Sequence, residues 1–125
     1  MFNTLLVEGN ASFRQALSDV LFSYFPLIDV EEAGDGEEAL SKVEYSRPDI
    51  IFMDIQLPGE NGLEVTRKIK RVYKEIVIVI LSSHTLPEYR QQAIRHGADC
   101  FLSMEDDTYM DDILARVEVQ IAGES

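Results

Sequence analysis

Five short apolar runs alternate with five longer amphipathic segments along the chain, and no other sequence feature constrains the fold as strongly. The runs DIIFM at 49–53 and IVIVIL at 76–81 are nearly continuous in apolar residues, which is typical of strands buried on both faces of a sheet. Strands that alternate with helices in sequence pair in parallel, with helices packed on both faces. The sequence therefore predicts an α/β fold: a doubly wound, flavodoxin-like (βα)5 sandwich with a five-stranded parallel sheet.

The spacing of the apolar residues sets the expected elements. At 125 residues, without a linker or a repeat, the chain is expected to form one domain around one core. Asn10 or Ser12 is a candidate N-terminal cap for the first helix, and Asp35 is one for the second. Tyr24 falls on the apolar face of the first helix and Val72 on that of the third. We expect strands at 4–7, 28–33, 49–53, 76–81 and 100–102, and helices at 12–24, 37–46, 63–72, 87–96 and 108 to about 122.

Acidic residues outnumber basic ones by 23 to 11, which gives the chain a net charge of −12. Because phosphate contacts need clustered Lys and Arg, this balance argues against direct binding of nucleic acid by the domain. It argues equally against docking on anionic lipid. The charge is compatible with binding a divalent cation or a basic partner.

The cysteine content and the N-terminus both favour the cytoplasm. Cys100 is the only cysteine, so no internal disulfide can form, and its apolar neighbours in CFL indicate a small core residue. The N-terminal MFNTLLVEGN lacks the basic start and the long apolar stretch of a signal peptide. No apolar run approaches the ~20 residues that cross a bilayer, so we expect a cytoplasmic protein without a membrane segment.

An aspartate stands directly after an unbroken apolar run in the chain. In IIFMDIQLPGENG, residues 50–62, Asp54 follows four apolar residues, and Pro58 and Gly59 mark a loop. In open parallel sheets, ligands bind at the carboxyl ends of the strands, where the strand order switches. The position of Asp54 therefore indicates a site at the tip of the central strand.

Other polar side chains end neighbouring strands and are expected at the same edge. Glu8 follows the first strand, SSH at 82–84 follows the fourth, and SME at 103–105 follows the fifth. Ser82 could serve the site or only bond to local backbone, as serines at strand ends commonly do. His84 is expected in solvent, where a protonated ring could offer a partial cation to the site.

At these residues the chain resembles the response-regulator receiver domains of two-component signalling. The segment FMDIQLPGENGLE is close to that family's Met-Asp-x-x-Met-Pro-Gly-x-x-Gly-Leu-Glu signature, and IVILSSH followed by AIRHGADCFLSME is similar to its Ser/Thr strand and its Gly-Ala-x-x-(Tyr/Phe)-Leu stretch. The residues around SSH and GADCFL are most similar to those of NarL/FixJ-type receivers, which carry a helix-turn-helix output domain. The resemblance implies one receiver domain over 1–125, either alone or as the N-terminal part of a longer regulator.

The resemblance assigns roles to four strand-end residues. Asp54 stands where the family has its phosphoacceptor, whose carboxylate oxygen attacks a phosphohistidine or a small phosphodonor. Gln56 stands where a backbone carbonyl contacts Mg²⁺ in the family. Ser82 matches the hydroxyl that binds the phosphoryl group. Phe101 matches the aromatic switch residue, although ordinary core packing explains a phenylalanine there equally well.

Two positions depart from the family pattern. Glu8 matches the first of two adjacent acids, but Gly9 occupies the place of the second, which in the family is a direct Mg²⁺ ligand. Met104 occupies the place of the lysine that pairs with the acceptor carboxylate. Mg²⁺ prefers an octahedral set of oxygen ligands, and methionine neither carries charge nor donates a hydrogen bond. We therefore expect weakened Mg²⁺ binding at Glu8, Asp54 and the Gln56 carbonyl, and weak or absent phosphorylation.

Two mechanisms remain open for such a domain. In the first, a sensor histidine kinase phosphorylates Asp54 and the domain switches a partner. In the second, a degenerate receiver regulates a DNA-binding output domain without phosphate. It is controlled by other proteins, a second copy or a ligand, through its fourth and fifth strand–helix units. The missing lysine and metal ligand favour the second, because a buried carboxylate without a cation tends toward a raised pKa and is then a poor nucleophile.

An enzyme is the remaining alternative. Phosphatases and dehalogenases with an aspartate nucleophile place a further acid two residues on, where this chain has Gln56. No Gly-rich phosphate loop of the Walker or dinucleotide type is present, and EGNASF at 8–13 is a weak candidate for a flavin loop. We therefore expect neither an enzyme nor an organic cofactor.

Overall fold

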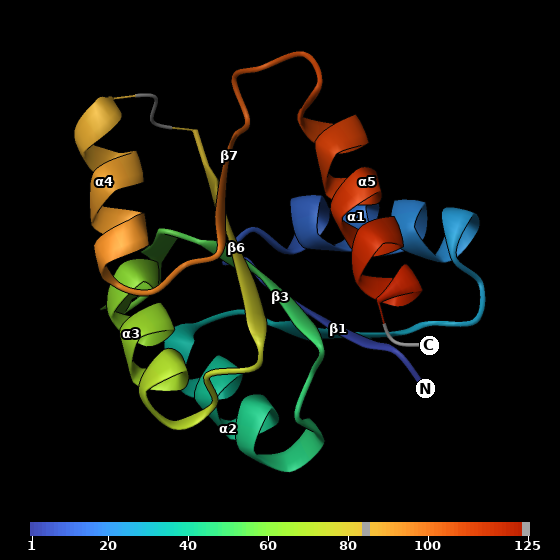
Figure 1. Cartoon of the computed structure of the whole chain (residues 1–125), viewed down its shortest axis with the longest axis horizontal. Helices are drawn as coiled ribbons and strands as arrows, with labels where there is room; N and C mark the ends of the chain where they lie inside the picture. Colours follow the sequence, from blue (N-terminus) through green and yellow to red (C-terminus); the bar gives the residue numbers. More distant parts are fainter. Residues whose placement is uncertain (84–85, 124–125) are drawn as a thin grey trace.

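The structure is a computed structural model that describes residues 1–83 and 86–123 (Figure 1). One sheet of five parallel strands has the order β2-β1-β3-β6-β7, so the predicted flavodoxin-like (βα)5 fold is confirmed. Its strands are β1 (Asn3–Val7), β2 (Asp29–Ala33), β3 (Ile50–Asp54), β6 (Val77–Ser82) and β7 (Cys100–Ser103). The helices are α1 (Ala11–Tyr24), α2 (Gly36–Ser46), α3 (Gly62–Val72), α4 (Pro87–Arg95) and α5 (Tyr109–Ala122).

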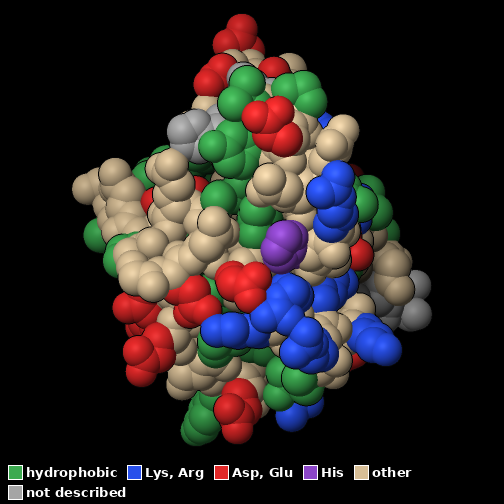
Figure 2. All heavy atoms as spheres, turned by 90° about the vertical axis from the view of Figure 1, so that its left-hand side faces the viewer, with side chains coloured by type: hydrophobic (Ala, Val, Ile, Leu, Met, Phe, Trp, Pro, Cys, Tyr) green, Lys and Arg blue, Asp and Glu red, His purple; other side chains and the backbone are tan. Residues whose placement is uncertain are grey.

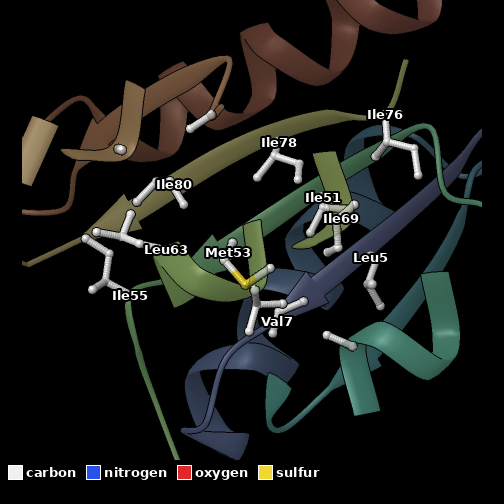
Figure 3. Close-up of a cluster of buried hydrophobic side chains, with 14 of the residues drawn as sticks. Leu5, Val7, Ile51, Met53, Ile55, Leu63, Ile69, Ile76, Ile78 and Ile80 are labelled. Carbon is white, nitrogen blue, oxygen red and sulfur yellow. The ribbon is translucent and has the colours of Figure 1, made fainter. Parts of the chain in front are cut away.

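The helices cover the sheet in two layers. Figure 1 shows α1 and α5 on one face and α2, α3 and α4 on the other. Neighbouring residues of each strand point to opposite faces. In β3, Ile51 and Met53 belong to the cluster under α2, α3 and α4, which Figure 3 shows in close-up, whereas Ile50 and Phe52 belong to the cluster under α1 and α5. This two-sided burial explains why the strand sequences are continuously apolar.

Two predicted helix caps are present. The Asn10 side chain, rather than that of Ser12, accepts a hydrogen bond from the Phe13 amide at 3.0 Å at the start of α1. Asp35 accepts one from the Glu38 amide at 2.8 Å at the start of α2. Each cap satisfies an amide that the first helical turn leaves without a partner.

Three details differ from the sequence prediction. Tyr24 and Val72 are 65% and 67% exposed, because each is the last residue of its helix, where the chain leaves the sheet face. The antiparallel hairpin formed by β4 (Gln56–Leu57) and β5 (Glu60–Asn61) was not predicted, because two-residue strands are too short to show a periodicity.

Among the described residues, no helix combines the length and the apolar character needed to cross a bilayer.

The two-sided core yields a stability prediction. Phe52 is 1% exposed and Phe22 is 50% exposed, so the two phenylalanines form a matched pair. Phe52→Ala should lower the free energy of unfolding by about 3–5 kcal/mol, because it removes a ring from a packed core. Phe22→Ala should lower it by less than about 1 kcal/mol. Urea denaturation measures both, and equal losses for the two variants would contradict the packing described here.

Candidate functional site

The sheet register brings two acidic side chains together at the carboxyl edge. Val7 of β1 pairs with Met53 of β3, so Glu8 and Asp54, the residues that follow, stand next to one another. On the other side of β3, Asp54 pairs with Leu81 of β6, and Ser82 follows directly. The register therefore places Glu8, Asp54 and Ser82 on three adjacent strands at the edge where the sequence predicted a site.

The carboxyl groups of Glu8 and Asp54 are hydrogen-bonded to each other. Burial, then the charge of Glu8 and this hydrogen bond, raise the pKa of Asp54 to about 7, against the lowering effect of the Gln56 and Ile55 amides. The Gln56 amide donates to Asp54 Oδ1 at 3.3 Å, and the Asn10 amide donates to Glu8 Oε1 at 2.9 Å. Asp54 therefore keeps its proton up to near neutral pH, and the direction of this shift is the one expected from the sequence.

No cationic side chain neutralises this pair among the residues that the structure describes. The basic residue that comes near is Arg14, whose Nη1 donates to the Glu8 backbone carbonyl at 2.6 Å. Its Nε, however, is held by Glu32 Oε1 at 2.8 Å in an ion pair. The guanidinium charge is therefore largely balanced by Glu32.

Met104 contacts the core. Its half-buried side chain packs against the cluster under α1 and α5, and its amide donates to the Ser82 carbonyl at 2.8 Å. The backbone contact ties the end of β7 to the end of β6. The side chain fills apolar space at the position where the resemblance places a lysine.

The loop after β3 closes tightly over the edge. A Cβ atom at Gly62 would lie 1.9 Å from the Asp54 carbonyl oxygen, so no other residue fits there with this backbone. A Cβ atom at Gly9 would lie 2.9 Å from Cδ of Pro58, in the turn of the β4–β5 hairpin. The proline ring therefore rests on Gly9, and an aspartate at that position would have to displace the ring.

Ser82 and Phe101 are both buried, at 1% and 6% exposure. The ring of Phe101 belongs to the cluster under α2, α3 and α4, and the Arg90 guanidinium lies 4.9 Å from its centroid. In this structure Phe101 therefore acts as a core residue with its ring turned inward. Gln56 is exposed, and His84 lies outside the described residues.

The side chains available as Mg²⁺ ligands at this edge are the carboxyl groups of Glu8 and Asp54. Within residues 1–83 and 86–123, no group of three or more His, Cys, Asp or Glu side chains gathers closely enough to hold a metal ion. The two carboxyl groups present, Glu8 and Asp54, are bonded to each other, and only the Gln56 carbonyl is assigned as a further ligand by the resemblance. Mg²⁺ usually keeps several waters and takes one or two protein carboxylates, so Glu8 and Asp54 would supply only part of its octahedral oxygen set.

Sequence reasoning missed two contacts of this site. The stacking of Pro58 on Gly9 and the pairing of Arg14 with Glu32 both join segments far apart in sequence, so no local pattern encodes them. The Pro58-Gly59 dipeptide is a turn signal that could have indicated the hairpin.

Similarity to known proteins covers nearly the whole chain. The family model described as response regulator receiver domain matches residues 4–117. The transcriptional activator protein ExaE of Pseudomonas putida is 37% identical over 99 residues, which cover 79% of this chain and 46% of that protein. The transcriptional regulatory protein DegU of Brevibacillus brevis is 30% identical over 119 residues, which cover 95% of this chain and 50% of that protein.

A solved structure agrees with these relatives. A two-component response regulator of the LuxR family from Aurantimonas sp. SI85-9A1 superposes with a TM-score of 0.84 at 28% identity, covering 97% of this chain and 85% of that one. The predicted leaning toward regulators of the NarL/FixJ type is therefore confirmed by the relatives. The chain spans about half the length of the curated relatives it matches.

The raised pKa of Asp54 yields a prediction on pH. The carbon-13 shift of the Asp54 carboxyl group should titrate with a midpoint near 7 rather than near 3.8. Glu8→Gln should lower that midpoint, because it removes a neighbouring charge and supplies an amide donor, whereas Glu37→Gln on exposed α2 should leave it unchanged.

The same proton links stability to pH. The folded state binds the Asp54 proton more tightly than the unfolded chain does, so this contribution is full below about pH 3.8 and is lost as pH rises through about 7. Asp54→Asn should remove this dependence and make the protein more stable than the wild type at pH 8. A wild type that gains stability from Asp54 ionisation between pH 5 and pH 8 would contradict this assignment.

Proposed function

Because the chain belongs to the response regulator receiver domain family, we propose that it is a two-component signalling module with Asp54 at its phosphoacceptor position and with weak phosphorylation. Its partners are a sensor histidine kinase and the signalling proteins that respond to it, in the cytoplasm. The domain accepts a phosphoryl group or a protein partner, and we assign it no enzymatic activity of its own. Since the matched relatives are about twice as long, we expect a further output segment in the whole protein.

The hydrogen bond between Glu8 and Asp54 carries this proposal. For transfer from phosphohistidine, an Asp54 oxygen must bond to phosphorus while the phosphorus–nitrogen bond breaks and its electron pair returns to the imidazole. An ionised carboxylate does this readily, whereas a protonated carboxyl group is a much weaker nucleophile and must also lose its proton. With a pKa of about 7, Asp54 is protonated in a large fraction of molecules at neutral pH.

The surroundings of Asp54 support the same conclusion. Phosphoryl transfer depends on positive charge placed where negative charge develops. The position matching the family's lysine holds Met104, which packs into the core, and the position matching the second acid holds Gly9, which lies under Pro58. The scaffold of a receiver is therefore retained with little of the charge that drives its chemistry, and we expect Mg²⁺ to bind weakly.

A second function, partner binding independent of phosphate, is favoured by the state of Phe101. Its ring is buried and held by Arg90, while Ser82 is almost fully enclosed. A domain that keeps this arrangement presents a constant surface around α4, β7 and α5. As a pseudo-receiver it would regulate a DNA-binding output segment through protein contacts alone.

Intact mass after incubation with acetyl phosphate and excess Mg²⁺ separates the two functions. The wild type should gain a phosphoryl group at least about tenfold more slowly than Gly9→Asp/Met104→Lys, because the double variant restores a metal ligand and a cation. Gly9→Asp alone should help little, since the aspartate must first displace the Pro58 ring.

Asp54→Asn in each background is the control and should abolish the gain. Rapid, Mg²⁺-dependent modification of the wild type at Asp54 would overturn weak phosphorylation. A wild type that is never modified, beside a double variant that is, would favour the pseudo-receiver.

A further inference from the structure

The basic residues of this acidic chain gather on one side. Five of its 11 Lys and Arg residues lie between positions 67 and 74, on α3 and directly after it. Figure 2 shows several Lys and Arg side chains gathered below a histidine on this face of the molecule. His96 directly follows α4. The two elements are joined there, because His96 Nε2 lies 3.7 Å from Glu64 Oε2 and Lys70 Nζ lies 2.7 Å from Asp99 Oδ2.

Only part of this positive charge is neutralised within the molecule. Ion pairs occupy Arg67 with Glu64 at 2.5 Å, Lys68 with Glu60 at 2.5 Å, and Lys70 with Asp99. In the part of the chain that the structure describes, the exposed Arg71, Lys74 and Arg95 form no ion pair. Val72, which follows Arg71, and Ile94, which precedes Arg95, are 67% and 56% exposed. We name this set the basic face: Arg71, Val72, Lys74, Ile94 and Arg95.

A complementary surface stands elsewhere on the same chain. No Lys or Arg occurs between Arg95 and Arg116, and five acids fall within eight residues of this interval. All five are exposed, and none forms an ion pair among the described residues. We name this set the acidic segment: Glu105, Asp106, Asp107, Asp111 and Asp112.

The two surfaces cannot meet within one molecule. Figure 1 shows α3 and the end of α4 on the left of the sheet, whereas the loop before α5 stands at the top right. We propose that the basic face of one copy binds the acidic segment of a second copy, so that the domains associate head to tail. Such a contact is heterologous and leaves one free surface at each end, which permits further copies to add.

Charge favours a second copy over a nucleic acid as the occupant. The net charge of −12 repels a long polyphosphate over the whole molecule, and the basic face opposes that repulsion with three unpaired cations. The acidic segment instead presents a short anionic stretch that matches three cations, next to the half-buried Tyr109 and Met110. Val72 and Ile94 supply apolar contacts that a phosphate backbone cannot use.

Two charge-reversed variants test the proposal by sedimentation velocity at millimolar protein and low salt. One carries Arg71→Glu, Lys74→Glu and Arg95→Glu, and the other carries Glu105→Lys, Asp106→Lys and Asp107→Lys. The wild type should show a mass that rises with concentration, and each variant alone should associate at least about tenfold more weakly. A mixture of the two should associate again, because the intact basic face of one meets the intact acidic segment of the other.

A matched control separates local contact from net charge. Glu37→Lys/Glu44→Lys/Glu118→Lys raises the net charge from −12 to −6, as the acidic-segment variant does, at exposed positions on α2 and α5. This control should associate as the wild type does or more strongly. A wild type that stays monomeric, variants that associate like the wild type, or a mixture that does not associate would each overturn the proposal. Binding of a single-stranded DNA probe to the basic face in place of a second copy would overturn it as well.

Discussion

The pairing of β3 with a strand on each side is the constraint on which the rest of the structure depends. Residues Ile50 to Met53 are at most 1% exposed. Parallel pairing with β1 on one side and β6 on the other fixes the register of β3. Asp54 is therefore carried to the carboxyl edge, beside the residue that follows β1. Gly62 then returns the chain so closely over the Asp54 carbonyl that no side chain could stand between them. The meeting of Glu8 and Asp54 is thus imposed by the sheet and not by local preference.

Two carboxyl groups held together must share a proton or attract a cation. Among the residues that the structure describes, no cation neutralises the pair, because Arg14 is paired with Glu32 and the half-buried Met104 packs against the core. The raised pKa of Asp54 follows from this arrangement. The receiver scaffold, with its buried Ser82 and Phe101, is retained. The surroundings of Asp54 are the basis of our proposal that phosphoryl transfer to it is weak.

Much of the fold was predictable because its signals are local. The continuous apolar runs indicated strands covered on both faces, and Asn10 and Asp35 indicated two helix starts that the structure confirms. The raised pKa of Asp54 was also predictable in direction, since Gly9 and Met104 supply neither charge nor hydrogen-bond donors. The β4–β5 hairpin was missed because two-residue strands carry no periodicity. The contact between the Pro58 ring and Gly9 was missed because it joins segments that are far apart in the sequence. The separation of the basic face from the acidic segment was equally invisible, since it depends on where α3, α4 and α5 stand around the sheet.

Titration of the protein with Mg²⁺ at neutral pH, followed by the nuclear magnetic resonance signal of the Asp54 carboxyl group, tests most directly whether a proton has replaced the metal between Glu8 and Asp54. We expect no saturable shift of that signal at millimolar Mg²⁺, and saturation only at pH values well above 7, where the proton has left. Saturable binding at neutral pH, with release of the shared proton at submillimolar Mg²⁺, would show that the two carboxyl groups still form a working metal site.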